Sequence, residues 1–211
     1  IKRRVMFEKK ISKFFVSYLK FDLFGRFSMK QKDFVRLNDE LKVETIKRIL
    51  TTNSGSEYPP RRKPIEEIIK KIVNNDLFKL TLHSSTIISN RDQISFTRES
   101  SVTQIIMKDG IYVSPGENKL WDDRFEVFSI TNKIFCSKIS LENWDFIKNI
   151  FFKFEKRKIS FEIIKTLPLI VFSKTYLIPF ISSPLELRKN GISFNFTTKR
   201  KITSNKFLII N

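Results

Sequence analysis

The chain has 211 residues, 41% of them apolar, so it is long and hydrophobic enough to bury a core, which excludes an intrinsically disordered protein. It carries 40 lysines and arginines against 22 aspartates and glutamates, a formal net charge of +18. The excess is spread, with 20 basic and 10 acidic side chains in residues 1–80 and 20 and 12 in residues 81–211. This distribution predicts a large polyanionic partner rather than a single basic tail.

Cysteine and histidine are too few for a structural metal site. Cys136 and His83 are the only residues of their kinds, so neither an internal disulfide nor a four-ligand zinc site can form, and a reducing cytoplasm is expected. The longest apolar run, residues 168–181, is interrupted by Lys174 and is too short to cross about 30 Å of hydrocarbon. No signal peptide is present and the chain opens at Ile1 rather than Met, so we expect a cytoplasmic piece of a longer protein, without a membrane partner.

Hydrophobic periodicity predicts four helices in the first part of the chain. Apolar residues recur on one face of residues 5–20, Ser28 can cap a short helix through Leu37, and Asn38 or Asp39 can cap a third. The fourth begins at Pro64, a residue suited to a first helical position, and carries an apolar stripe from Ile65 to Val73. With short links between them, these helices predict a small bundle over residues 1–78.

Three consecutive cations, Arg61, Arg62 and Lys63, stand directly before the fourth helix. The positive end of the helix dipole disfavours cations there, so helix stability does not account for them. A helix start flanked by cations suits a phosphate, and we interpret these residues as contacts to a phosphodiester backbone. A solvated loop that is basic by chance is the alternative.

From residue 79 the period changes from 3.6 to 2, which predicts a mostly antiparallel α+β domain over residues 79–211. Strands are expected at residues 80–88, 93–97, 111–113, 124–128, 133–139, 169–173, 175–178, 192–197 and 207–210. Ser140 can cap a helix that exposes Lys148 and Lys153, and the last two strands are separated by Lys199, Arg200 and Lys201.

Enzymatic motifs are missing from the sequence. No glycine-rich phosphate-binding loop occurs, and no histidine has a nucleophile pattern around it. The acidic pairs Glu66-Glu67 and Asp122-Asp123 consist of sequence neighbours, which diverge on a helix or a strand and so suit a paired-carboxylate site poorly. We therefore expect this chain to be non-catalytic by itself.

Several fragments, taken in order over about residues 40–180, resemble one family of RNA-modifying enzymes. They are Tyr58-Pro59-Pro60-Arg61 with Ile65-Glu66, Thr81-Leu82, Thr97-Arg98-Glu99, Trp121-Asp122-Asp123-Arg124-Phe125, and Leu167-Pro168-Leu169-Ile170-Val171 with Tyr176-Leu177-Ile178-Pro179-Phe180. Together they are similar to the C-terminal region of tRNA(Ile)-lysidine synthetase in its alphaproteobacterial form.

The resemblance implies that the two predicted domains are the family's two C-terminal domains, which hold the tRNA. It also implies that the whole protein is an ATP-dependent RNA-modifying ligase, which attaches lysine to the wobble cytidine of a minor isoleucine tRNA. That chemistry belongs to an N-terminal domain with an S-G-G-x-D-S motif, where ATP, Mg²⁺ and lysine would bind. The motif is absent from this chain, so no catalytic residue and no cofactor is assigned to it.

The preferred interpretation is a clamp in which cations of both domains neutralise tRNA phosphates. The expected RNA contacts are Arg61, Arg62, Lys63, Arg98, Arg124, Lys148, Lys153, Lys199, Arg200 and Lys201. Trp121 could stack on a base, although burial in the core is favoured for so large an aromatic side chain. The alternative is a basic interaction module for an anionic membrane surface or an acidic protein, and a homodimer is left open.

Overall fold

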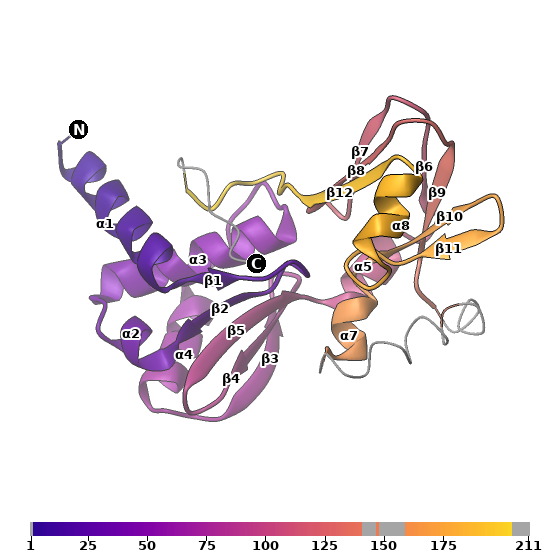
Figure 1. The fold of residues 1–211 in the computed structure, drawn as a ribbon. Helices are drawn as coiled ribbons and strands as arrows, with labels where there is room; N and C mark the ends of the chain where they lie inside the picture. Colours follow the sequence, from indigo (N-terminus) through magenta and orange to yellow (C-terminus); the bar gives the residue numbers. More distant parts are fainter. Residues whose placement is uncertain (1, 141–146, 148–158, 204–211) are drawn as a thin grey trace. The chain divides into compact units, whose positions relative to one another are not determined.

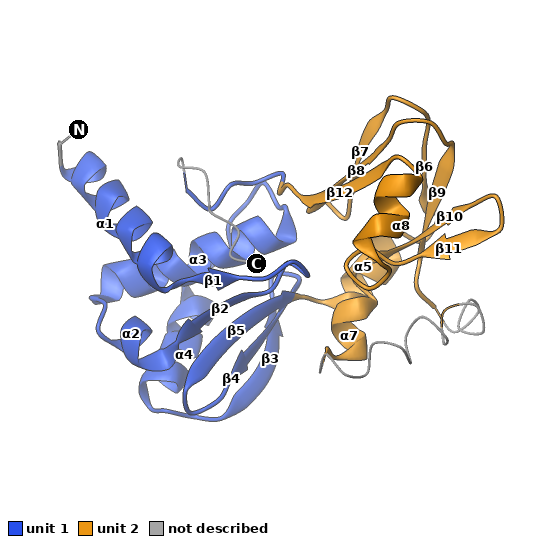
Figure 2. Cartoon of the chain, viewed as in Figure 1, with its two compact units in different colours: residues 1–97, 199–211 blue, residues 98–198 orange. Residues whose placement is uncertain are grey.

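The computed structural model describes residues 2–140, 147 and 159–203, which fall into two compact units (Figure 2). Unit 1 contains residues 1–97 together with the segment that begins at Lys199, and unit 2 contains residues 98–198. The start of the chain and a segment from near its end therefore share one unit. The domain boundary predicted at residue 78 lies inside unit 1, whereas the chain passes between the units at residues 97 and 98.

Unit 1 combines helices with a five-stranded sheet whose strand order is β1-β2-β5-β4-β3 (Figure 1). Its elements are α1 (Lys2–Tyr18), β1 (Lys20–Phe21), β2 (Phe27–Lys30), α2 (Gln31–Val35), α3 (Asp39–Ser54), α4 (Arg62–Val73), β3 (Phe78–Leu82), β4 (Ser85–Ser89) and β5 (Gln93–Arg98). Helices α3 and α4 pack together, and α3 also contacts β4. The apolar side chains between the helices and the sheet form one core.

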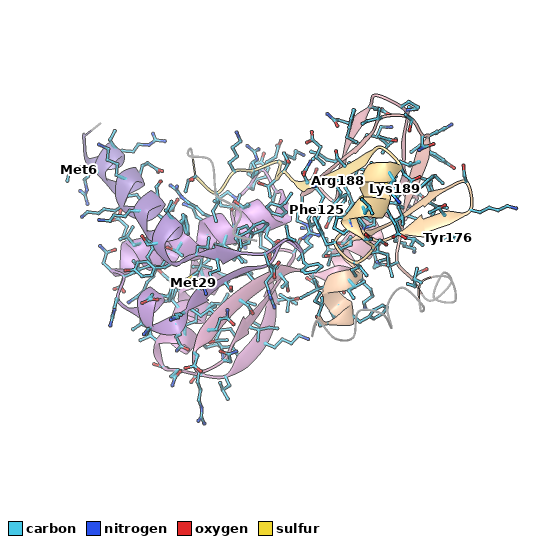
Figure 3. All side chains as sticks on the ribbon, viewed as in Figure 1. Met6, Met29, Phe125, Tyr176, Arg188 and Lys189 are labelled. Carbon is cyan, nitrogen blue, oxygen red and sulfur yellow. The ribbon has the colours of Figure 1, made fainter. Side chains whose placement is uncertain are left out.

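The predicted N-terminal helical bundle is wrong, because residues 20–30 contribute strands to this sheet. β2 pairs antiparallel with β5, with Phe27 opposite Phe96 and Met29 opposite Ile94. Both members of the second pair are fully buried, and Figure 3 shows Met29 within unit 1. Ser28 therefore lies in a strand rather than at a helix cap, and α2 is reduced to five residues. The fold is mixed α+β from its start, since pairing with a distant strand overrides the local helical pattern.

Two helices of unit 1 match their sequence signals closely. The Asn38 side-chain oxygen accepts a hydrogen bond from the Leu41 backbone N–H at 2.9 Å, which confirms Asn38 as the cap of α3. Gly55 ends this helix with the left-handed φ of 68°. Helix α4 begins at Arg62, two residues before the predicted Pro64, and buries Ile65, Ile68 and Ile72 as its pattern requires.

A tight turn divides the strand predicted over residues 80–88. His83 and Ser84 adopt φ values of 52° and 59°, and the flanking residues Leu82 and Ser85 pair across the turn between β3 and β4. Two successive left-handed residues give the twist that a short hairpin needs. Glycine or asparagine usually provides this conformation, so His and Ser produced no turn signal in the sequence.

Unit 2 contains two smaller antiparallel sheets, with strand orders β11-β10-β9-β6 and β12-β8-β7. Its elements are α5 (Ser100–Ile106), β6 (Ile111–Val113), β7 (Asn118–Trp121), β8 (Phe125–Ser129), β9 (Ile134–Lys138), α7 (Phe161–Ile164), β10 (Pro168–Phe172), β11 (Thr175–Leu177), α8 (Pro184–Lys189) and β12 (Ile192–Phe196). The predicted strand at residues 111–113 and the hairpin around Ser173 and Lys174 are confirmed. The helix predicted after Ser140 and the strand predicted at residues 207–210 lie outside the described residues.

An aromatic cluster fills the core beside β8 and β12. The Phe125 ring stacks on Phe194 at a centroid distance of 4.9 Å and meets Phe196 edge-on at 5.3 Å. Figure 3 shows Phe125 among the side chains of unit 2. The antiparallel register places Phe125 opposite Phe196, so pairing of two strands distant in sequence builds this part of the core.

A pair of glycine substitutions tests the packing of unit 2. At Gly110, φ is 65° and an added Cβ would lie 2.5 Å from Phe135 Cζ and 2.6 Å from the Cys136 carbonyl oxygen. At Gly116, φ is 79° and no atom lies within 4 Å of an added Cβ. Gly116→Ala should lower the free energy of unfolding by about 1 kcal/mol through backbone strain, and Gly110→Ala by about 3 kcal/mol because a steric clash is added. Urea denaturation followed by fluorescence measures both, and equal losses would contradict the packing described here.

Candidate nucleic-acid interface

The structure separates the predicted RNA contacts into exposed, buried and undescribed side chains. Arg61, Arg62 and Lys63 are exposed on unit 1, and so are Lys199, Arg200 and Lys201. Arg98 and Arg124 are buried in unit 2. Lys148 and Lys153 lie outside the described residues. Every predicted contact that is both described and exposed therefore belongs to unit 1.

The first three cations lie where the chain enters α4. Arg61 is the residue before the helix, with extended backbone (φ −61°, ψ 148°), and its side chain does not cap the helix. The Arg62 Nε donates a hydrogen bond to Glu66 Oε1 at 2.7 Å, one turn along the helix. Lys63 is exposed on the same first turn. All three side chains are exposed, but Arg62 and Lys63 lie within the first turn of α4 rather than before it, and Arg62 is partly neutralised by Glu66.

An ion pair brings the late cations to the same part of unit 1. Arg200 Nη2 lies 3.7 Å from Glu57 Oε1, and Glu57 precedes Arg61 by only four residues. Four residues span at most about 14 Å of extended chain. We call the six cations of these two segments the basic cluster: Arg61, Arg62, Lys63, Lys199, Arg200 and Lys201. Two carboxylates, Glu57 and Glu66, pair with members of the cluster, so the cluster keeps a positive net charge.

A hollow of about 360 Å³ lies beside the basic cluster, between α1, α3 and the start of α4. Its lining includes Phe7, Glu40, Glu44, Lys47, Pro60 and Arg62. Burial opposes ionisation of Glu44, but hydrogen bonds from Lys47 and Arg48 outweigh it and lower the pKa of this carboxyl. Glu44 is therefore ionised at neutral pH and repels an anion. The hollow does not suit a phosphate, and contact with a polyanion is restricted to the exposed side of the cluster.

The two buried arginines of unit 2 share one carboxylate. Arg98 Nη2 lies 2.7 Å from Asp122 Oδ1, and Arg124 Nη2 lies 2.8 Å from Asp122 Oδ2. The exposed fractions of these three side chains are 1% or less. Thr103 also donates a hydrogen bond to Asp122 Oδ2, at 2.7 Å. Neither arginine has surface left for a phosphate, so their position does not support the predicted RNA contacts, and they stabilise unit 2 instead.

Burial lowers the pKa of Arg124 to about 10; the Asp122 charge opposes this shift, and the neighbouring Arg98 charge adds to it. Arg124 still carries its charge at neutral pH. Its Nη1 is buried without a hydrogen-bond partner among the described residues. Asp122 thus balances two buried guanidinium groups at once, which makes its carboxylate important for the stability of unit 2.

The exposed aromatic side chain of this region is Tyr58, which the sequence analysis did not select. Trp121 is fully buried and its Nε1 donates a hydrogen bond to the Thr166 carbonyl oxygen at 3.0 Å, so the core alternative is confirmed. Tyr58, in contrast, is 78% exposed and lies between Glu57 and the two prolines before Arg61. The available signal was its position two prolines before the three cations. Tyr58 also belongs to the first of the fragments that carry the family resemblance.

The described residues place the single cysteine in the core and gather no cluster of metal-ligating side chains. The Cys136 thiol is fully buried, and burial raises its pKa to about 12, so it is not a nucleophile in the folded protein. Within residues 2–140, 147 and 159–203, no group of three or more His, Cys, Asp or Glu side chains is placed to hold a metal ion. None of the helices in these ranges combines the length and apolarity needed to cross a bilayer.

Comparison of the chain with protein-family models, with curated proteins and with solved structures found no match.

Replacing Asp122 with Asn should strongly destabilise unit 2. Asn keeps the shape of the side chain and tolerates the left-handed φ of 50° at this position, so the change isolates the charge. Loss of the carboxylate removes the buried ion pairs that Asp122 makes with Arg98 and Arg124, and we expect a loss of about 3–5 kcal/mol in the free energy of unfolding. Asp109→Asn, at an exposed position of the same unit, is the control and should change stability by less than about 0.5 kcal/mol. An Asp122→Asn loss no larger than the control would contradict the structural role.

The Cys136 thiol should make stability fall at alkaline pH. Its pKa is about 12 in the folded state against an ordinary value of 9.0 for an exposed thiol, so above pH 9 the unfolded state loses the proton first and stability decreases. Between pH 9 and 11 the native protein should lose about 1 kcal/mol per pH unit more than a Cys136→Ala variant, as measured by urea denaturation. If the unfolding free energy fell equally with pH in the two proteins, the pKa of the buried thiol would not be raised. At pH 8, a thiol reagent should label Cys136 only when urea unfolds the protein, because the thiol is buried in the folded state.

Proposed function

We propose that unit 1 binds the phosphate backbone of a folded RNA, with tRNA as the preferred class, through the basic cluster. The observation that carries the proposal is the convergence of two cationic segments, residues 61–63 and 199–201, joined by the ion pair between Glu57 and Arg200. Six exposed cations in one region attract a polyanion and release its counterions on binding. Contacts of this kind fix the position of an RNA without reading its sequence.

The net charge of +18 supports a nucleic acid as the polyanion. The cations of the cluster come from a helix start and a loop, so they can follow a phosphate backbone without entering a groove. Side chains cannot read the deep, narrow major groove of an A-form helix, so backbone and shape recognition is the expected mode for a structured RNA.

The resemblance to the C-terminal region of tRNA(Ile)-lysidine synthetase makes tRNA the preferred class of RNA. In that proposal the chain holds the substrate, while ATP-dependent ligation of lysine takes place in another domain of the same protein. Helix α4 and the Tyr58-Pro59-Pro60-Arg61 fragment before it contribute to both arguments, since they carry the resemblance and the exposed cations. The sequence predicted that cations of the second domain also hold the RNA. This part of the clamp is not included in the proposal, because Arg98 and Arg124 are buried and cannot reach a phosphate.

Changing Arg61, Arg62 and Lys63 together to Ala should weaken binding to total tRNA by about tenfold or more at physiological salt. The slope of log affinity against log salt should become shallower by roughly 2 to 3, since each lost phosphate contact contributes about 0.7 to 0.9. Lys199, Arg200 and Lys201 changed together should have an effect of the same order. A salt titration followed by gel shift or fluorescence anisotropy measures both quantities.

The matched control removes the same charge from unit 2, as Lys108→Ala, Arg188→Ala and Lys189→Ala, at exposed positions; the last two are labelled in Figure 3. If the location of the cations matters and not only their number, the affinity of this control for tRNA should stay within about twofold of that of the unchanged protein. If the control and the cluster variants lost the same tRNA affinity, the loss would follow from the net charge of the protein and not from the position of the cluster. Binding to anionic liposomes without binding to tRNA would overturn the proposal in favour of a membrane surface, and a loss confined to one tRNA would contradict backbone recognition.

A further inference from the structure

Tyr58 is the most exposed large hydrophobic side chain of the described residues, at 78%. Within those residues its ring contacts no other aromatic ring and its hydroxyl makes no hydrogen bond. An exposed tyrosine ring of this kind adds little to the stability of the fold, because its apolar face remains in contact with water. The ring contributes little to the core, so its surface is available to a ligand, and the case for a nucleotide rests on its neighbours.

The backbone of Tyr58 is held in place although its ring is not. The Ser56 hydroxyl accepts a hydrogen bond from the Tyr58 N–H at 3.3 Å and donates one to the Tyr58 carbonyl oxygen at 3.0 Å. Pro59 and Pro60 follow, and Pro60 is buried. Proline restricts both its own φ and the residue before it. The ring is thus presented from a rigid stem and has only two side-chain torsions to order on binding, which keeps the entropic cost low.

The surroundings of Tyr58 suit a nucleotide. Glu57, the preceding residue, pairs with Arg200, and Arg61 follows three residues later, so two cations of the basic cluster are tied to the immediate neighbours of Tyr58, one by an ion pair and one by sequence. An aromatic face beside cations is the usual arrangement for unpaired nucleotides, in which the base stacks and the adjacent phosphates are neutralised. Inside a duplex both faces of a base are covered by its neighbours, so away from the duplex ends only an unpaired base can stack on an external ring.

We propose that Tyr58 stacks on an unpaired base of the bound RNA while the basic cluster holds the phosphates on either side of it. This inference rests on the proposed function and adds the class of RNA feature that the site requires, which is a single-stranded loop, bulge or end. The cluster provides affinity for any backbone, and Tyr58 provides preference for an unpaired nucleotide.

The test uses a short single-stranded RNA that carries 2-aminopurine and a blunt RNA duplex, each titrated with the full chain. Tyr58→Ala should weaken binding of the single strand by about tenfold, within the 1–3 kcal/mol range for one stacked base, and leave duplex binding unchanged. Tyr58→Phe should retain single-strand binding, and Tyr58→Leu should not, because only an aromatic ring stacks. Quenching of 2-aminopurine fluorescence should occur with the unchanged protein and be lost with Tyr58→Ala.

Tyr112→Ala is the matched control, since Tyr112 is an exposed tyrosine of unit 2 whose ring already packs against Phe135 at 4.6 Å. It should leave both RNAs bound as before. The salt dependence of Tyr58→Ala should equal that of the unchanged protein because no charge is removed, whereas the Arg61, Arg62 and Lys63 variant should have a shallower slope.

The outcomes separate the inference from the proposed function. If the unchanged protein binds neither RNA, the proposed function fails and the inference fails with it. If binding occurs and depends on the basic cluster, but Tyr58→Ala binds the single strand normally, the inference alone is overturned. The same holds if Tyr58→Leu binds as well as Tyr58→Phe, or if Tyr58→Ala weakens duplex and single strand equally.

Discussion

Pairing of β2 with β5 is the constraint on which the architecture of unit 1 depends. It joins residues 27–30 to residues 93–96 and so converts an apparently helical N-terminal segment into part of a five-stranded sheet. With the sheet in place, α3 packs on β4 and α4 packs on α3, and the loop between the two helices exposes residues 57–59. Tyr58 and Arg61 lie in that loop, and Arg62 and Lys63 begin α4, so the proposed RNA site lies on a segment that links two helices of this unit.

Burial, rather than residue type, separates the arginines that can bind a polyanion from those that cannot. Arg61 and Arg98 have the same side chain, and both stand in sequence fragments that carry the family resemblance. Arg61 is exposed before α4, whereas Arg98 is bonded to Asp122 in a site without solvent. A buried guanidinium has given up its hydration for a fixed carboxylate and has no free surface for a phosphate. Excess charge in a sequence therefore overestimates the charge that is available for recognition.

Affinity and discrimination are assigned to different side chains in the proposed site. Cations provide affinity that depends on salt and accepts any phosphate backbone. An exposed aromatic ring provides a contact that duplexes cannot make, and its contribution does not depend on charge. The two contributions can be measured independently, because substituting Tyr58 removes no charge and substituting the cluster removes no ring.

The sequence by itself determined the helices with strong local signals, such as α3 with its Asn38 cap, the exposed cations at the start of α4, and the β10–β11 hairpin of unit 2, because caps, amphipathic stripes and turns act over a few residues. The tertiary structure alone decided that residues 20–21 and 27–30 form strands, that Arg98 and Arg124 are buried around Asp122, and that Arg200 pairs with Glu57, four residues before Arg61. Each of these depends on partners far away in the chain. Local sequence patterns carry no information on which distant segment will supply the partner, so only the folded chain could bring them together.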